Sequence, residues 1–124
     1  MVQSLNTRAD FTTEAISYVG FPKYGKIMIG DKAIEFFSDK NVTDNIQFPW
    51  PSIRHVEAYV SKSGKIDNNF YIVLQNGHKV RLGSNNSGKI LKLIRDQIGD
   101  EKVLRTETMT STFKKLISRF TRKK

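Results

Sequence analysis

The sequence predicts a mainly β protein, in which a curved sheet of seven antiparallel strands is closed by one helix. Short runs rich in Ile, Val and aromatic residues, bounded by Gly, Pro, Asn and Ser, follow one another from residue 12 to residue 82. The period then changes, and residues 84–98 carry apolar side chains at helical spacing. A chain of 124 residues is long enough for one domain with one modest core.

The strands are organised around residues 25–50, which hold three apolar runs: Ile27–Ile29, Ala33–Phe37 and Ile46–Trp50. We expect a β-meander with Ile29 opposite Ile34 and Ile27 opposite Phe36, because this register keeps the apolar side chains on one face. Prolines on both sides of Trp50 end the third run, since proline cannot donate to an interior ladder. We therefore expect Trp50 to belong to the core.

Four further strands and a polar loop complete the prediction. Thr12–Gly20 precedes the meander, Ile53–Val60 alternates apolar and polar residues, and Ser61–Asn69 is expected to be a loop. Phe70–Leu82 is expected to be a hairpin. A two-residue turn at Asn76-Gly77 would place an apolar residue opposite a charged one, so we expect a three-residue loop with Gly77 in the left-handed conformation.

One helix is expected over Ser84–Ile98. Its apolar residues are Ile90, Leu91, Leu93, Ile94 and Ile98. A polar residue at 84, 86 or 87 can cap its start, and Gly99 fits the left-handed position after its end. Asp100–Thr108 is expected to be irregular and to complete a first domain, residues 1–108.

Residues 109–124 form a separate segment, for which we expect a basic amphipathic helix. One stripe is apolar and the opposite face is cationic with no acid. These residues are the candidate site for a partner or a membrane: Met109, Phe113, Lys114, Lys115, Leu116, Ile117, Arg119, Phe120, Arg122, Lys123 and Lys124. Such a helix is typical of membrane-surface or groove binding. The alternative is a second helix packed on the core.

Charge follows the same division of the chain. The net charge is +9, which favours an anionic partner, either nucleic acid or a membrane surface. Six of the 21 cations lie in residues 109–124, so the remaining 15 face 12 acids and leave a body of only +3.

Residues that could carry chemistry are few, and we expect no enzyme, no cofactor and no metal site. Gly83–Ile90 matches the first seven positions of a phosphate-binding P-loop, but Ile90 stands where Ser or Thr would hold magnesium. Capping and solvation explain that stretch better than an incidental anion site. His55 shares a strand face with Glu57, without a pocket or nucleophile in evidence. Lys79 and Arg81 are expected to be solvated, and His78 flanks a turn.

The chain has no cysteine, no signal-peptide pattern and no apolar run near the roughly 18 residues of a spanning helix. We therefore expect a soluble protein of a reducing cytoplasm.

Three motifs, MVQSLNTRAD at residues 1–10, YGKIMIGDKAIEFF at residues 24–37 and IQFPW at residues 46–50, closely resemble a small bacterial family. These are the ManO-like proteins, long labelled only as a domain of unknown function and usually encoded beside mannose-family sugar phosphotransferase (PTS) transporters. The resemblance extends to the NG hairpin, the ILKLIR helix and the FKKLISRF segment.

This resemblance implies a pleckstrin-homology or GRAM-type fold and a non-enzymatic accessory or regulatory role. The implied partners are the subunits of a mannose-family PTS permease, with docking at the cytoplasmic membrane face. The competing expectation, motivated by a pI near 9.9, is a nucleic-acid-binding regulator of the sugar-transport operon.

Overall fold

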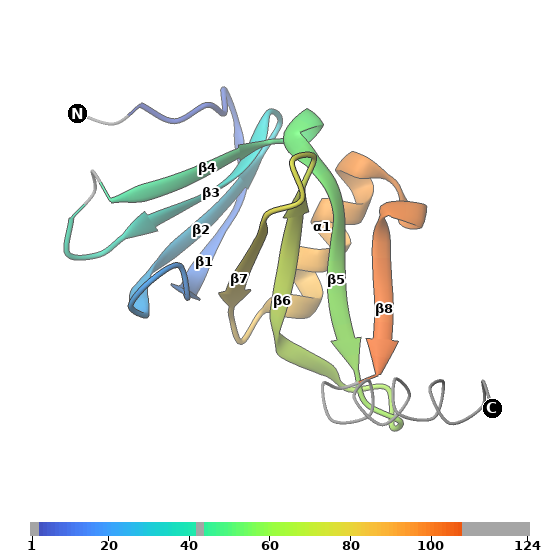
Figure 1. Ribbon diagram of the computed structural model, residues 1–124. Helices are drawn as coiled ribbons and strands as arrows, with labels where there is room; N and C mark the ends of the chain where they lie inside the picture. Colours follow the sequence, from blue (N-terminus) through green and yellow to red (C-terminus); the bar gives the residue numbers. More distant parts are fainter. Residues whose placement is uncertain (1–2, 42–43, 108–124) are drawn as a thin grey trace.

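The computed structural model describes residues 3–41 and 44–107, which form one mixed β-sheet with one α-helix on one of its faces (Figure 1). The strands are β1 (Ala9–Ser17), β2 (Lys23–Gly30), β3 (Ala33–Ser38), β4 (Asn45–Pro49), β5 (Ile53–Val60), β6 (Ile66–Leu74), β7 (Lys79–Gly83) and β8 (Val103–Glu107). Their order in the sheet is β4-β3-β2-β1-β7-β6-β5-β8. The mainly β prediction is confirmed.

The central meander has the expected register. Ile27 lies opposite Phe36 and Ile29 opposite Ile34, and all four side chains are buried. After β4 the chain forms a short 3-10 helix, Trp50–Ser52, whose tryptophan is 8% exposed. Its indole Nε1 donates to the carbonyl of Gly30 at 3.2 Å, which fastens the end of the meander to β2.

The hairpin of β6 and β7 also has the expected register, with Phe70 opposite Leu82 and Ile72 opposite Val80. Its loop is Gln75-Asn76-Gly77, and Gly77 has φ of 90°. A two-residue turn would have shifted the register by one residue and moved the apolar side chains of one strand to the polar face. The apolar pattern of the two strands therefore decides the loop length.

The prediction of seven antiparallel strands is wrong, because residues expected to be irregular form an eighth strand. β8 runs parallel to β5, with Val56 opposite Val103. Val103 is the one residue of β8 whose side chain is buried among those described, so no apolar alternation marks this strand in the sequence. Within the described residues, β4 and β8 are the two ends of the sheet and do not pair with each other, so the sheet is not closed.

Two strand boundaries also differ from the prediction. β1 begins and ends three residues earlier than Thr12–Gly20. β6 begins at Ile66, within the stretch expected to be a loop. The polar residues at the start of β6 are held by the first residue of the helix, since Ser87 Oγ donates a hydrogen bond to the Asp67 carbonyl at 2.9 Å. Such long-range bonds leave no pattern in the local sequence.

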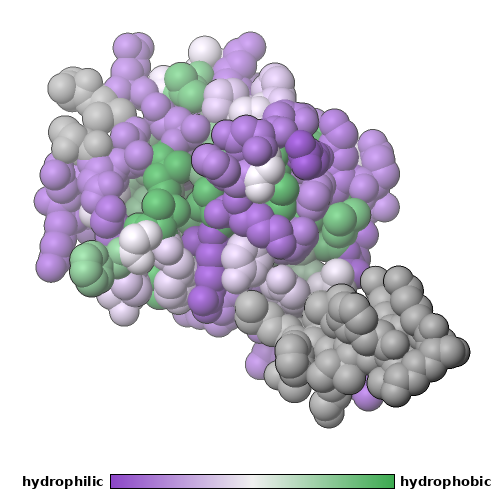
Figure 2. Space-filling model, viewed as in Figure 1, coloured by the Kyte–Doolittle hydropathy of each residue, from purple (hydrophilic) through white to green (hydrophobic). Residues whose placement is uncertain are grey.

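The helix α1 (Ser87–Ile98) packs mainly on β6 and lies behind β5 and β6 in the view of Figure 1. Ile90, Leu91 and Ile94 are buried against the sheet, and Gly99 follows the helix with a positive φ of 104°, although its ψ of 149° lies outside the left-handed helical conformation that was expected. The opposite face of β5, β6 and β7 is therefore not covered by α1. In the same view Figure 2 shows mostly hydrophilic residues on this side, with hydrophobic ones between them.

The sheet is narrowest between β1 and β7, which share only two residue pairs: Ile16 with Gly83 and Ser17 with Leu82. Beyond them, the segment before α1 bonds to β1. Ser84 Oγ donates to the Glu14 carbonyl at 2.8 Å, and Asn86 Nδ2 donates to Thr13 Oγ1 at 2.7 Å. The sheet thus consists of two four-stranded halves joined by a short seam.

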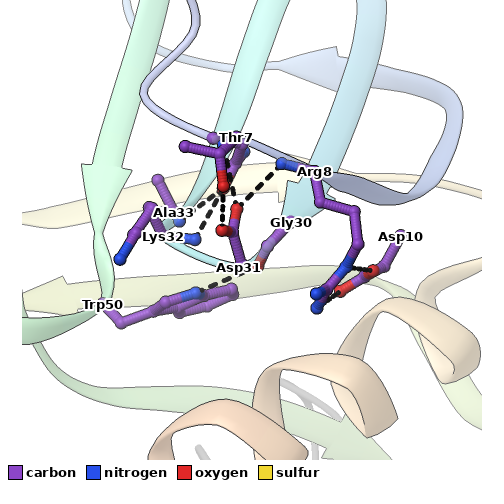
Figure 3. A network of polar contacts seen from close by, with 9 residues as sticks. Thr7, Arg8, Asp10, Gly30, Asp31, Lys32, Ala33 and Trp50 are labelled. Atoms are coloured by element: carbon purple, nitrogen blue, oxygen red, sulfur yellow. Dashed lines mark hydrogen bonds and ion pairs between the residues drawn. The ribbon is translucent and has the colours of Figure 1, made fainter.

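Residues 4–8 form an N-terminal strap that is bonded to the turn between β2 and β3 (Figure 3). The Asp31 carboxylate accepts bonds from Thr7 Oγ1 and from the backbone N–H groups of Thr7 and Arg8 at 2.9 and 3.1 Å. The Thr7 hydroxyl in particular lowers the pKa of Asp31 to about 2. The strap is therefore part of the fold, although its Leu5 side chain is 43% exposed.

A second carboxylate anchors the strap from β3. Glu35 is fully buried and accepts four hydrogen bonds: from Ser4 Oγ at 2.5 Å, Leu5 N at 3.0 Å, Asn6 Nδ2 at 2.8 Å and Gln47 Nε2 at 2.6 Å. Burial alone would raise its pKa, but the four donors outweigh burial and hold the pKa below its ordinary value. A buried carboxylate is thus stabilised by neutral donors.

Candidate functional site

The residues predicted from the sequence to meet a partner, in 109–124, lie outside the described residues. The candidates within residues 3–41 and 44–107 are the P-loop-like stretch, the histidine–glutamate pair and the uncovered face of the sheet.

The P-loop-like stretch is used to join α1 to the sheet. Its Ser84 and Asn86 side chains bond to β1 as described above, and Asn85 Oδ1 accepts from Asn68 Nδ2 at 3.1 Å. The ammonium of Lys89 lies 5.2 Å from the centre of the Phe11 ring. A cation placed over an aromatic ring is stabilised there, so this arrangement supports the structural interpretation of the stretch.

The face of β5, β6 and β7 that α1 does not cover carries a cluster of charged side chains. The sequence spacing predicted two of them, His55 and Glu57, as neighbours. His55 Nε2 lies 3.1 Å from Glu57 Oε2, as expected for residues two apart on a strand. Lys79 Nζ, from β7, donates to the other carboxylate oxygen at 3.0 Å. Burial opposes ionisation of Glu57, but its bonds with His55 and Lys79 prevail and lower its pKa. The same bond with Glu57 raises the pKa of Lys79.

Tyrosines surround this group. The rings of Tyr59 and Tyr71 meet edge to face, with centroids 6.0 Å apart, and Lys79 Nζ lies 5.6 Å from the centre of the Tyr71 ring. Burial raises the pKa of Tyr59, with a smaller contribution from Glu57. These side chains hold one another in place.

The face continues to the seam between the two halves. The Arg81 guanidinium lies over the Tyr18 ring, 4.2 Å from its centre, and its Nε is buried without a hydrogen-bond partner within the described part of the chain. A buried donor left without a partner costs about 1–3 kcal/mol. We name the whole set the tyrosine–cation surface: Tyr18, His55, Glu57, Tyr59, Tyr71, Lys79 and Arg81.

Strand register creates this surface. Tyr71 lies directly opposite Glu57 on one side and Arg81 on the other, so three strands contribute neighbouring side chains to one row. The apolar phases of the strands place Phe36, Phe48 and Phe70 on the inner face, where all three are buried. The tyrosines lie on the opposite, polar phases, which were not recognised as a site. The available signal was that Tyr59 shares the polar phase of its strand with Glu57.

Neither a metal cluster nor a membrane span is present in the described chain. No group of three or more His, Asp or Glu side chains gathers there in a way that could hold a metal ion. None of its helices has the length and apolar character needed to cross a membrane.

Fold and surface define a mainly β protein with one helix-covered and one uncovered sheet face. The chain belongs to the family described as domain of unknown function (DUF956), whose model matches residues 1–117.

Comparison with solved structures supports the fold. The chain is similar to the crystal structure of the C-terminal domain of an unknown protein from Leishmania infantum, with a TM-score of 0.61 and 15% identity, over 73% of this chain and 84% of that chain. At that identity the likeness concerns the fold alone. No curated protein matches the chain.

Proposed function

We propose that this protein is a non-enzymatic accessory or regulatory subunit of a mannose-family PTS permease, which docks through its tyrosine–cation surface. The partner is suggested by the motif resemblance to the ManO-like proteins. The mode of action is suggested by the structure, because tyrosine and arginine are the residues that most often dominate protein interfaces. The observation that carries the proposal is the row of tyrosines and cations on one face: Tyr59 packs edge to face on Tyr71, Lys79 lies beside Tyr71, and Arg81 lies over Tyr18.

The surface is ordered as well as rich in interface-forming residues. Tyr59 and Tyr71 are packed against each other, so docking would cost little side-chain entropy. At the rim of the tyrosine–cation surface, the charged group formed by Glu57, His55 and Lys79 would fix the orientation of the docked partner.

The finer features of the proposal come from the sequence. The sheet would be a variant of the pleckstrin-homology or GRAM fold. Residues 109–124 would be a second, detachable element on the cytoplasmic membrane face, where cations are attracted to anionic lipids.

The test is co-purification of the tagged full chain from detergent-extracted native membranes, with the permease subunits identified by mass spectrometry. Loss of a hot-spot side chain costs about 2 kcal/mol or more, which is roughly 30-fold in affinity. Tyr71→Ala should therefore abolish recovery of the permease. The matched control is Phe37→Ala, a half-buried aromatic on β3, which three strands separate from β6 in the sheet. Recovery that both variants reduce equally, or that neither reduces, would contradict the proposal.

A nucleic-acid-binding regulator remains the second candidate, because Lys79 and Arg81 lie beside tyrosines on this face. Binding to nucleic acid falls steeply with salt, in proportion to the phosphates neutralised. A permease complex that persists at high salt, together with weak binding to duplex and single-stranded DNA, would exclude this candidate.

A further inference from the structure

A slot opens on the helix side of the sheet, between the start of α1 and the ends of β5 and β8. Its volume is about 240 Å³. Its walls are apolar and come from Ala58, Ile66, Leu91 and Val103. Ile66 is 38% exposed, while the other three side chains are buried. Apolar surface thus reaches solvent at the bottom of a concave site.

The slot stays open because Gly88, in the first turn of α1, has no side chain. A Cβ on this residue would lie 3.5 Å from Ile66 Cδ1, which is ordinary van der Waals contact. Alanine would therefore fit there without strain. A long side chain on that Cβ would extend into the slot.

Three cations line the slot: Lys92, Arg95 and Arg105. Arg105 donates to Asp100 Oδ1 at 2.8 Å, and Arg95 Nη1 lies 4.0 Å from the same oxygen. One carboxylate thus serves two guanidinium groups, and Lys92 is exposed, so the rim has an excess of positive charge. This charge repels residues 109–124, whose six charged side chains are all cationic.

We propose that this slot binds one large apolar side chain of an acidic segment in a partner protein. Sites for drug-sized ligands begin at about 300 Å³, so the slot suits a single side chain such as phenylalanine or leucine. Carboxylates beside that side chain would meet the cationic rim. A lipid surface is flat and complements this concave shape less well.

This inference goes beyond the proposed function and does not depend on it, because the slot and the tyrosine–cation surface lie on opposite faces of the sheet. The probe is a fluorescent synthetic peptide with one phenylalanine between glutamates, and its partner peptide has alanine at that position. Both are titrated against the full chain by fluorescence anisotropy. The phenylalanine peptide should bind about tenfold or more tightly than the alanine peptide, as expected when one anchor dominates an interface.

The matched variants are Gly88→Met, which fills the slot, and Gly88→Ala, which leaves it open. Both should raise the melting temperature slightly, since glycine is a poor helix former. Only Gly88→Met should abolish peptide binding. Lys92→Glu should weaken binding by about threefold to tenfold, as for loss of a screened rim charge, whereas Lys32→Glu, in the β2–β3 turn, should not.

Equal affinity for the two peptides, or unchanged binding by Gly88→Met, would overturn the proposal. A second experiment measures binding of the full chain to anionic phospholipid vesicles. Vesicle binding that Gly88→Met abolishes, with no binding of either peptide, would show a lipid occupant and would also overturn it. Tighter peptide binding after removal of residues 109–124 would show that this segment of the same chain occupies the slot, which would likewise overturn the proposal.

Discussion

At the scale of single residues, the Trp50 side chain should contribute strongly to the stability of the meander. It is almost fully buried and also bonds to the Gly30 carbonyl. Trp50→Ala should cost about 3–5 kcal/mol, against a total of roughly 5–15 kcal/mol for a domain of this kind. We expect a poorly soluble or molten protein by circular dichroism and thermal melting. Melting within about 3 °C of wild type would mean a loss below roughly 1 kcal/mol and would contradict a core role.

Glu35 should make the stability depend on pH. Its folded-state pKa is below the ordinary value of 4.5, so its contribution is complete above that pH and is lost as the pH falls through the folded value. Glu35→Gln replaces a charged acceptor and should cost roughly 2–3 kcal/mol at pH 7. In urea unfolding, the gap between wild type and variant should narrow as the pH is lowered below 4.5. A gap that stays constant down to pH 3 would show that the charge is unimportant.

Asp31 should also make the stability fall with decreasing pH, but over a lower pH range than Glu35. Its pKa falls from 3.8 to about 2, so its contribution is present above pH 3.8 and is lost as the pH falls through about 2. Asp31→Asn should loosen the Thr7–Arg8 end of the strap already at neutral pH, while Glu35 still holds Ser4, Leu5 and Asn6, and amide proton exchange at Thr7 and Arg8 would detect this. Unchanged exchange at these amides would contradict the role of Asp31.

At the scale of elements, the loop of the β6–β7 hairpin allows a clean test of backbone conformation. A Cβ on Gly77 would meet nothing within 4 Å, so substitution costs arise from φ of 90° alone. Gly77→Val should destabilise by roughly 1–2 kcal/mol, because β-branched residues adopt this region poorly. Gly77→Asn should cost less, since asparagine tolerates the left-handed region. Equal losses in denaturant unfolding would point to a cause other than φ.

Most elements could be predicted because apolar side chains alternate along them. This pattern placed both hairpins in register and assigned the core phenylalanines. It missed β8, whose pairing with β5 depends on α1 bringing the chain back, and the polar start of β6, which long-range bonds hold. The tyrosine–cation surface was missed for a related reason: it requires three strands in register, and no single strand contains it.

At the scale of the whole molecule, residues 109–124 should be a detachable targeting element. An isolated helix of this length is marginal in water, so docking requires a surface. Phe113→Asp together with Phe120→Asp should abolish membrane attachment, because the apolar stripe is lost while every cation remains. Melting of the body should be unchanged. A double variant that unfolds the body would show that this segment is core.

The short seam between β1 and β7 has a consequence for how the chain acquires its structure. Strands β1–β4 are consecutive in sequence, as are β5–β7 with α1 and β8, so each half is built from one continuous stretch of the chain. The seam instead joins residues 16–17 to residues 82–83 and closes a long loop. Contacts that close long loops are entropically costly and tend to form late. We therefore expect the two halves to be separate units in native-state hydrogen exchange. The seam should open before either half unfolds, which would briefly expose the buried edges of β1 and β7 as sites for strand exchange between molecules.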